Sequence, residues 1–188
     1  MTAILPLVTW TGSGRDEEPG RPETLEQLVR QIGGVGLRSG NAVHLYLDVS
    51  GSVESVLEPL YAAVHGVAQI IWRYVHLFST DVVDVPLRDL ANRACQTTGG
   101  TSIAAVARHI RQNGVRRAVI VTDGEVGCLG AGDEETLRET ILGVALTNGR
   151  QIDGDLAHLA RHVVVLRGLE SGRGPGRWRR RGRGGPTR

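Results

Sequence analysis

The sequence predicts an α/β protein built on a doubly wound, mostly parallel, Rossmann-like sheet with helices on both faces. Near-continuous apolar runs at residues 43–49 and 118–121 have the length and hydrophobicity of strands that are covered on both sides. Apolar side chains then recur every three or four positions after residue 52, and again after residue 102, as they do in amphipathic helices. Strand and helix therefore alternate along the chain, which is the order that right-handed parallel crossovers produce.

Residues 1–39 are predicted to form an N-terminal extension that packs on the main domain. Within it, residues 3–10 are apolar and β-prone and predict a short edge strand, whereas the turn and charged residues of 11–22 predict a loop. A helix is predicted next, and Gly33 and Gly34 end it. The apolar residues of this helix recur at helical spacing: Leu25, Leu28, Val29 and Ile32.

Residues 40–167 are predicted to form the main domain, which begins with the strand at 43–49. A helix follows, because residues from Val53 to Ile71 show the best helical period in the chain. Pro59 predicts either a kink in this helix or a helix that begins near it. The remaining elements are expected in this order: strands at 74–78 and 82–85, a short helix at 88–95, a helix from Ser102 to Asn113, a strand at 118–121, a helix at 133–142, a strand at 143–147, a short helix at 155–160 and a strand at 162–166.

Charge is distributed unevenly along the chain. All 22 Lys and Arg residues are arginine, which excludes a Schiff-base lysine and a P-loop lysine. Residues 171–188 contain seven arginines and no acid, so the rest of the chain carries 15 arginines and 20 acids. The body is therefore mildly acidic, and the Arg- and Gly-rich tail at 168–188 is predicted to be disordered.

The sequence predicts a cytoplasmic protein. Residues 1–8 lack a positive charge and contain Pro6, so they make a poor signal peptide. Apolar runs stay well below the roughly 18 residues that a membrane span needs. The two cysteines, Cys95 and Cys128, are too few for a disulfide framework and are expected to be free thiols.

Polar residues gather where segments of the predicted sheet end. Asp48, Ser50 and Ser52 follow the first buried strand as Asp-x-Ser-x-Ser. Thr101 ends a Gly-Gly-Thr loop before a helix, and Asp123 follows another buried strand. Because ligands of doubly wound sheets bind at the carboxyl ends of the strands, we expect these side chains to converge. Their oxygen atoms are the ligands that hard cations prefer.

The pattern resembles the metal-ion-dependent adhesion site (MIDAS) of the von Willebrand factor type A (vWA) domain, over about residues 40–167. The resemblance assigns five positions to the metal site: Asp48, Ser50, Ser52, Thr101 and Asp123. It implies that the three hydroxyls contact Mg²⁺ or Mn²⁺, with Ca²⁺ as a further option, while the carboxylates lie close and often act through water. Four glycines are expected to let the loops turn tightly: Gly51, Gly99, Gly100 and Gly124.

The resemblance implies a non-enzymatic, metal-dependent protein-binding module. Hydroxyls are neutral ligands, so the cation stays under-neutralised and can take an Asp or Glu of a protein partner as its last ligand. The chain departs from many family members at Ser102, where Asp is common, and it is similar to the small bacterial intracellular members. That similarity implies a component of a bacterial multi-protein system, for example one that contains an AAA+ ATPase.

Two other functions stay open at this stage. A nucleic-acid-associated protein, or one that contacts an acidic partner, would use the arginines and the tryptophan of the tail, because arginine neutralises phosphate and tryptophan stacks on bases. These tail residues are Arg177, Trp178, Arg179, Arg180, Arg181 and Arg183. A metal-dependent hydrolase is disfavoured, because Ser50 and Ser52 lack the Gly-x-Ser-x-Gly context of a nucleophile and the sequence offers no catalytic base.

The six histidines give no clear zinc signature. His158 and His162 are the one pair with His-x-x-x-His spacing, and no histidine is paired with cysteine at zinc-site distance along the chain. His44 and His76 lie in predicted apolar strands. We therefore expect both to be core or edge residues with satisfied hydrogen bonds.

Overall fold

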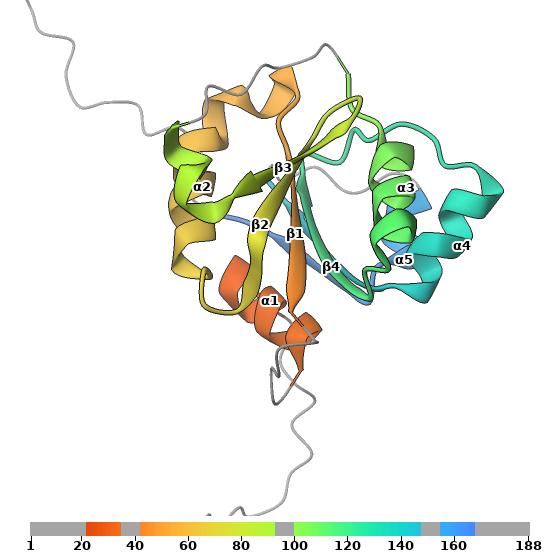
Figure 1. Ribbon diagram of the computed structural model, residues 1–188, viewed down its shortest axis with the longest axis horizontal. Coiled ribbons are helices and arrows are strands. Elements are labelled where there is room, and N and C mark those ends of the chain that lie inside the picture. The colour runs from red at the N-terminus through yellow and green to blue at the C-terminus, as the bar shows by residue number, and fades with distance from the viewer. Residues whose placement is uncertain (1–21, 35–41, 93–99, 148–154, 168–188) are drawn as a thin grey trace, which may run out of the picture.

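The computed structural model describes residues 22–34, 42–92, 100–147 and 155–167 (Figure 1). The predicted strand at 3–10 and the predicted disordered tail at 168–188, with its candidate contact residues, lie outside these ranges. Cys95 and Gly99 lie outside them as well. Within the described ranges, no helix is both long enough and apolar enough to cross a membrane.

Within the described residues, one six-stranded sheet forms the centre of the fold, in the order β3-β2-β1-β4-β5-β6. Its strands are β1 (Val43–Asp48), β2 (Ile71–Phe78), β3 (Val82–Pro86), β4 (Arg117–Thr122), β5 (Ile141–Leu146) and β6 (His162–Val165). Neighbouring strands are parallel except for the β2–β3 pair, which is antiparallel and forms one edge. The strand order reverses between β1 and β4, so the doubly wound, mostly parallel sheet that the sequence predicts is confirmed.

Helices cover both faces of the sheet (Figure 1). The helical elements are α1 (Leu25–Gly33), the 3₁₀ helix η1 (Gly51–Val56), α2 (Leu57–Gly66), the 3₁₀ helix η2 (Leu87–Asn92), α3 (Ile103–Asn113), α4 (Ala131–Glu139) and α5 (Asp155–Leu159). Alternate residues of β1 serve different faces: Leu45 and Leu47 join the core under α1 and α2, whereas Tyr46 joins the core under α3, α4 and α5. The sheet is therefore buried on both sides, as its apolar runs predict.

The helix predicted inside the N-terminal extension contributes directly to the core. Leu28 and Val29 of α1 are fully buried, and α1 packs against β4, β5 and β6. The helix crosses the sheet at Gly143, where an added Cβ would lie 2.9 Å from Ile32 Cγ1. The missing side chain at Gly143 therefore sets how closely α1 approaches β5.

A capping box begins α1. The Thr24 hydroxyl accepts a hydrogen bond from the Gln27 N–H at 3.2 Å, and the Gln27 side chain accepts one from the Thr24 N–H at 3.2 Å. Thr24→Ala removes one of these partners, so we expect the free energy of unfolding to fall by about 1 kcal/mol. Denaturant titration measures the change. Thr136→Ala in α4 is the control, because the Thr136 hydroxyl only donates to the Gly132 carbonyl of its own helix and its loss should be close to neutral.

The helix after β1 differs from the prediction at both ends. The predicted period from Val53 to Ile71 is divided into η1 and α2, and α2 ends at Gly66. Val67 and Ile71 are buried although neither is helical, so their apolar character reflects contact with the core rather than a helical face. Pro59 lies in the first turn of α2, where a backbone N–H would have no intrahelical partner, so proline is tolerated there. The helix therefore begins near Pro59 rather than being kinked by it.

Smaller differences concern element boundaries. The helix predicted at 133–142 is α4, which ends at Glu139, and the strand predicted at 143–147 is β5, which already begins at Ile141. Leu142 is buried in the sheet core rather than on a helix. Gly114 adopts a left-handed conformation after α3, which is the usual way for a helix to end at an Asn-Gly pair.

Candidate metal centre

Asp48 ends β1 at the carboxyl edge of the sheet, beside β4. Its Oδ1 accepts a hydrogen bond from the Ser50 backbone N–H at 2.9 Å, and its Oδ2 accepts one from the Thr122 hydroxyl at 2.8 Å. The side chain is 1 % exposed. Both carboxylate oxygens of Asp48 are therefore fixed in a nearly solvent-free position.

Two serine hydroxyls lie next to this carboxylate. Ser50 is extended and buried, whereas Ser52 is exposed on the first turn of η1. The 3₁₀ turn brings their Oγ atoms to 3.1 Å from one another. One hydroxyl therefore faces the buried Asp48 side of the site, and the other lies at the surface.

Asp123 supplies a second buried carboxylate from the end of β4, and it is 5 % exposed. Its Oδ1 accepts a hydrogen bond from the Glu125 N–H at 3.0 Å, and the Gly124 N–H donates to the Thr122 hydroxyl at 3.1 Å. Gly124 has a φ of 98°, a conformation that favours glycine. The sharp turn after β4 therefore depends on Gly124, as the sequence predicts.

Thr101 is placed by its backbone between the ends of β2 and β4. The Ser102 N–H donates to the Ser79 carbonyl at 2.7 Å, and the Ile103 N–H donates to the Val126 carbonyl at 2.9 Å. Gly127, with a φ of 75°, passes so close that an added Cβ would lie 3.3 Å from the Thr101 carbonyl oxygen. The loop that carries Thr101 is thus attached to the segment that follows Asp123.

The electrostatic environment of Asp48 is unfavourable for its negative charge. Burial raises the pKa of Asp48, and the nearby Asp123 carboxylate raises it further. The hydrogen bonds from Ser50 and Thr122 oppose this rise. A bound cation would compensate the two buried carboxylates. Hydroxyl and carboxylate oxygens are the donor set that suits Mg²⁺, Mn²⁺ or Ca²⁺, so the residues present fit the metal that the vWA resemblance implies.

Two of the predicted tight glycine positions are not tight. A Cβ added at Gly51 would meet nothing within 4 Å, and one added at Gly100 would meet only Thr80 Cγ2 at 3.9 Å. Gly51 is exposed, and neither residue has a positive φ. The expectation that both glycines permit a close backbone passage is therefore wrong, and of the described loop glycines only Gly124 has the conformational role that was predicted.

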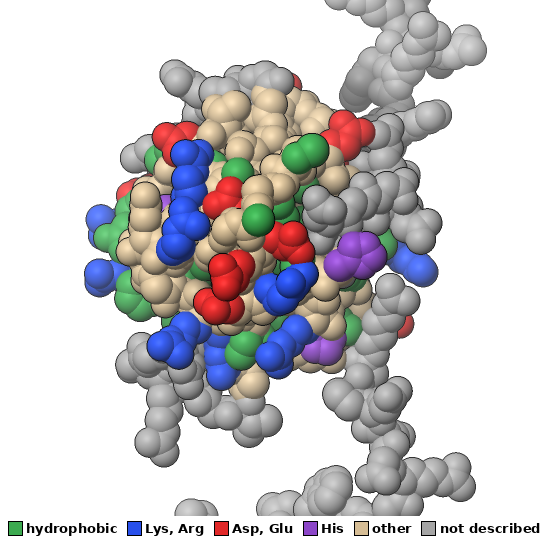
Figure 2. All heavy atoms as spheres, turned by 90° about the vertical axis from the view of Figure 1, so that its right-hand side faces the viewer, with side chains coloured by type: hydrophobic (Ala, Val, Ile, Leu, Met, Phe, Trp, Pro, Cys, Tyr) green, Lys and Arg blue, Asp and Glu red, His purple; other side chains and the backbone are tan. Residues whose placement is uncertain are grey.

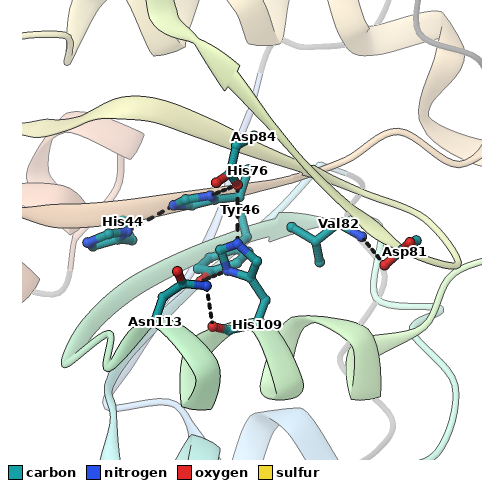
Figure 3. Close-up of polar contacts among 8 residues, drawn as sticks. All are labelled: His44, Tyr46, His76, Asp81, Val82, Asp84, His109 and Asn113. Carbon is teal, nitrogen blue, oxygen red and sulfur yellow. Dashed lines mark hydrogen bonds and ion pairs between the residues drawn. The ribbon is translucent and has the colours of Figure 1, made fainter.

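A second polar cluster lies under α3, on the face of β1 that carries Tyr46 (Figure 3). We call it the histidine cluster, and it consists of His44, Tyr46, His76, Asp84 and His109. His44 and His76 have hydrogen-bond partners, as predicted, but the cluster as a whole was not predicted, because its members come from four separate segments of the chain. The sequence does contain a signal for one of its contacts. His76 and Asp84 lie four residues before and four residues after Thr80, so they pair across the β2–β3 hairpin.

Comparison with known proteins gives a fold-level likeness. No protein-family model matches the sequence, and no curated protein shows a significant sequence match. Two crystal forms of proximal thread matrix protein 1 from the mussel byssus are similar in structure, with TM-scores of 0.56 and 0.54 at 15 % and 14 % sequence identity. The likeness covers 68 % of this chain but only 43 % and 44 % of those chains. At this identity the likeness supports the α/β fold alone.

Proposed function

We propose that this protein is a non-enzymatic module that binds a partner protein through a divalent cation held at the carboxyl edge of the sheet. The observation that carries the proposal is the fixed arrangement of Asp48, Ser50 and Ser52, which is hydrogen-bonded to β4 through Thr122 and lies beside Asp123. These residues come from two strands that flank the point where the strand order reverses, which is where doubly wound sheets bind ligands.

In this proposal the residues have different tasks. Ser50, Ser52 and Thr101 would hold Mg²⁺ or Mn²⁺ through neutral hydroxyls, and Asp48 and Asp123 would anchor water molecules around it. The cation supplies Lewis acidity toward an incoming oxygen ligand, because neutral hydroxyls leave much of its charge unbalanced. Asp48 and Asp123 are buried while Ser52 is exposed, so a partner's Asp or Glu would approach from the Ser52 side.

Replacing Ser52 by alanine tests the proposal. We expect the affinity for Mg²⁺ and Mn²⁺, measured by isothermal titration calorimetry, to fall about 10-fold or more, because one metal-directed hydroxyl is lost. Ser55→Ala is the matched control, since Ser55 is an exposed serine of the same 3₁₀ helix and lies outside the predicted ligand set. Equal affinity in the two variants, or no metal binding by the wild type, would contradict the proposal.

A pull-down tests the second half of the proposal. Tagged wild-type protein should retain a partner in Mg²⁺ and release it in chelator, and the Ser52→Ala variant should retain less of the same partner. Retention that is unchanged by chelator would show that binding does not pass through a metal.

The nucleic-acid alternative depends on the tail, because residues 171–188 contain seven arginines and no acid. On the face formed by α3 and α4, arginine and acidic side chains are interspersed (Figure 2), and Arg111 lies 3.6 Å from Asp133. Deletion of residues 168–188 should remove any salt-sensitive binding to RNA or DNA while leaving Mg²⁺ binding unchanged.

A further inference from the structure

The histidine cluster brings two imidazoles and a carboxylate from three elements to one point. His76 of β2 contacts Asp84 of β3 through Nδ1 and Oδ1 at 2.6 Å, and His109 Nε2 of α3 lies 3.2 Å from the same Oδ1. The potential ligand atoms of these three residues all lie within 4.8 Å of one another. Figure 3 shows both rings directed at the Asp84 carboxylate.

We propose that His76, Asp84 and His109 form a second metal site, separate from the hydroxyl site, that binds a borderline divalent cation such as Zn²⁺. Imidazole nitrogen and carboxylate oxygen are ordinary zinc ligands, whereas the site around Asp48 offers only oxygen. In a tetrahedral zinc site with bonds of about 2.0–2.1 Å, donor atoms lie about 3.3 Å apart. The ligand atoms of His76, Asp84 and His109 would therefore have to shift by only about 1 Å to reach this spacing.

The outer nitrogens of both histidines have partners that suit metal binding. His76 Nε2 lies 2.9 Å from His44 Nδ1, and His109 Nδ1 lies 2.9 Å from the Tyr46 hydroxyl. With metal bound, His76 Nε2–H would donate to His44 and His109 Nδ1–H would donate to Tyr46. Such partners fix the tautomer and the orientation of a metal-binding histidine.

The same contacts satisfy the cluster before metal binds. His76 Nδ1–H and His109 Nε2–H then donate to Asp84, and the outer nitrogens accept hydrogen bonds from His44 Nδ1–H and the Tyr46 O–H. Moving each ring proton to the opposite nitrogen and rotating the Tyr46 hydroxyl proton away from His109 converts one arrangement into the other. Metal entry therefore leaves the histidine rings with hydrogen-bond partners.

The elements that carry the three ligands are held firmly. His76 pairs with Tyr46 on β1 and with Asp84 on β3, and its ring stacks on the rings of Tyr46 and His44 at centroid distances of 4.6 and 5.1 Å. The ligand side chains are 3 %, 48 % and 15 % exposed for His76, Asp84 and His109. The site is thus closed on the sheet side and open to solvent at Asp84, so a water molecule would complete the coordination.

A bound Zn²⁺ would tie the edge hairpin β2–β3 to α3. The hairpin is the antiparallel edge of the sheet, and α3 packs against β3. A ligand that binds only the folded state raises stability in proportion to the logarithm of its concentration over its Kd. Zinc binding at this site should therefore be visible as an increase in Tm as well as in a binding isotherm.

Zinc titration of the full chain tests the inference. We expect the wild type to bind one Zn²⁺ from ZnCl₂, with an increase in Tm, and His109→Gln to bind at least about 100-fold more weakly. Tyr46→Phe keeps all three ligands and should lose only about 10-fold. His109→Gln is first compared with the wild type in chelator, so that a change in folding is separated from a change in metal affinity.

Three controls test exposed side chains outside the cluster as alternative zinc ligands. His65→Gln and His158→Gln remove exposed histidines outside the cluster, and Cys128→Ser removes an exposed thiol, so all three should bind zinc as the wild type does. Asp48→Asn should also retain zinc binding, which keeps this test separate from the proposed function. Absence of zinc binding in the wild type, or loss of binding in Cys128→Ser but not in His109→Gln, would overturn the inference.

Discussion

Replacing Asp48 by asparagine is expected to weaken Mg²⁺ binding by at least about 10-fold while leaving the metal-free protein at least as stable as the wild type. The carboxylate is 1 % exposed and lies close to the buried Asp123, so its charge is costly in the folded state without a cation. Asparagine has the same shape. Its Oδ1 can still accept from the Ser50 N–H. Its Nδ2 can donate to the Thr122 hydroxyl, which reverses the direction of that hydrogen bond and turns the Thr122 proton away from residue 48.

Two measurements separate the metal effect from the folding effect. Calorimetric titration with Mg²⁺ and Mn²⁺ should show a fall in affinity of about 10- to 100-fold or more, and thermal unfolding in chelator should show a Tm equal to or above that of the wild type. Asp89→Asn is the control, because Asp89 is a partly exposed acid on η2 outside both proposed sites. A variant with unchanged metal affinity would place the cation elsewhere. A variant that is much less stable in chelator would make Asp48 a structural residue.

Truncating Leu28 to alanine is expected to lower the free energy of unfolding by about 2–5 kcal/mol. Leu28 is 0 % exposed and packs from α1 onto β5. An added Cβ on Gly143 of β5 would lie 3.0 Å from Leu28 Cδ1. A cavity at this point removes dispersion contacts from the sheet as well as from α1. Val83→Ala is the control, because Val83 is 51 % exposed on the edge strand and its truncation should change stability by less than about 0.5 kcal/mol.

The contact between α1 and the sheet can be tested further with a double-mutant cycle. Gly143→Ala alone should destabilise the protein by about 1–3 kcal/mol, because its methyl group would overlap Leu28 and Ile32. In the Leu28→Ala background the methyl group no longer meets Leu28 Cδ1, although it still meets Ile32, so the two losses should not add fully and the coupling should exceed about 0.5 kcal/mol. Additive losses, measured by denaturant titration, would show that Leu28 does not contact residue 143 in solution.

The fold was predictable because β1 and β4 are apolar runs and because α1 and α3 each carry a clear helical period. The candidate metal residues were predictable because Asp48 and Asp123 directly follow two such runs. The end of α2 was not predictable from periodicity. Val67 and Ile71 continue the apolar spacing, but they are buried in the core from a turn and a strand. A pattern of hydrophobicity reports burial, and it identifies a helix only where the backbone remains helical.

The histidine cluster could not be predicted from local sequence patterns, for a different reason. His44 and His76 are adjacent only because β1 and β2 pair in parallel, and His109 reaches them only because α3 packs over β3. Strand order and helix placement are tertiary properties. The Asp-x-Ser-x-Ser residues, by contrast, share one turn, so their spacing alone indicates that they lie together.

The packing of α1 has a consequence for the order in which the molecule is completed during synthesis. The helix leaves the ribosome before any strand of the sheet, yet β4, β5 and β6, on which it rests, are translated more than 80 residues later. At ordinary translation rates this interval is on the order of ten seconds. Until then α1 can pack only against β1 and α2 among these neighbours, so its apolar side is only partly covered. The domain closes only when β4, β5 and β6 have emerged.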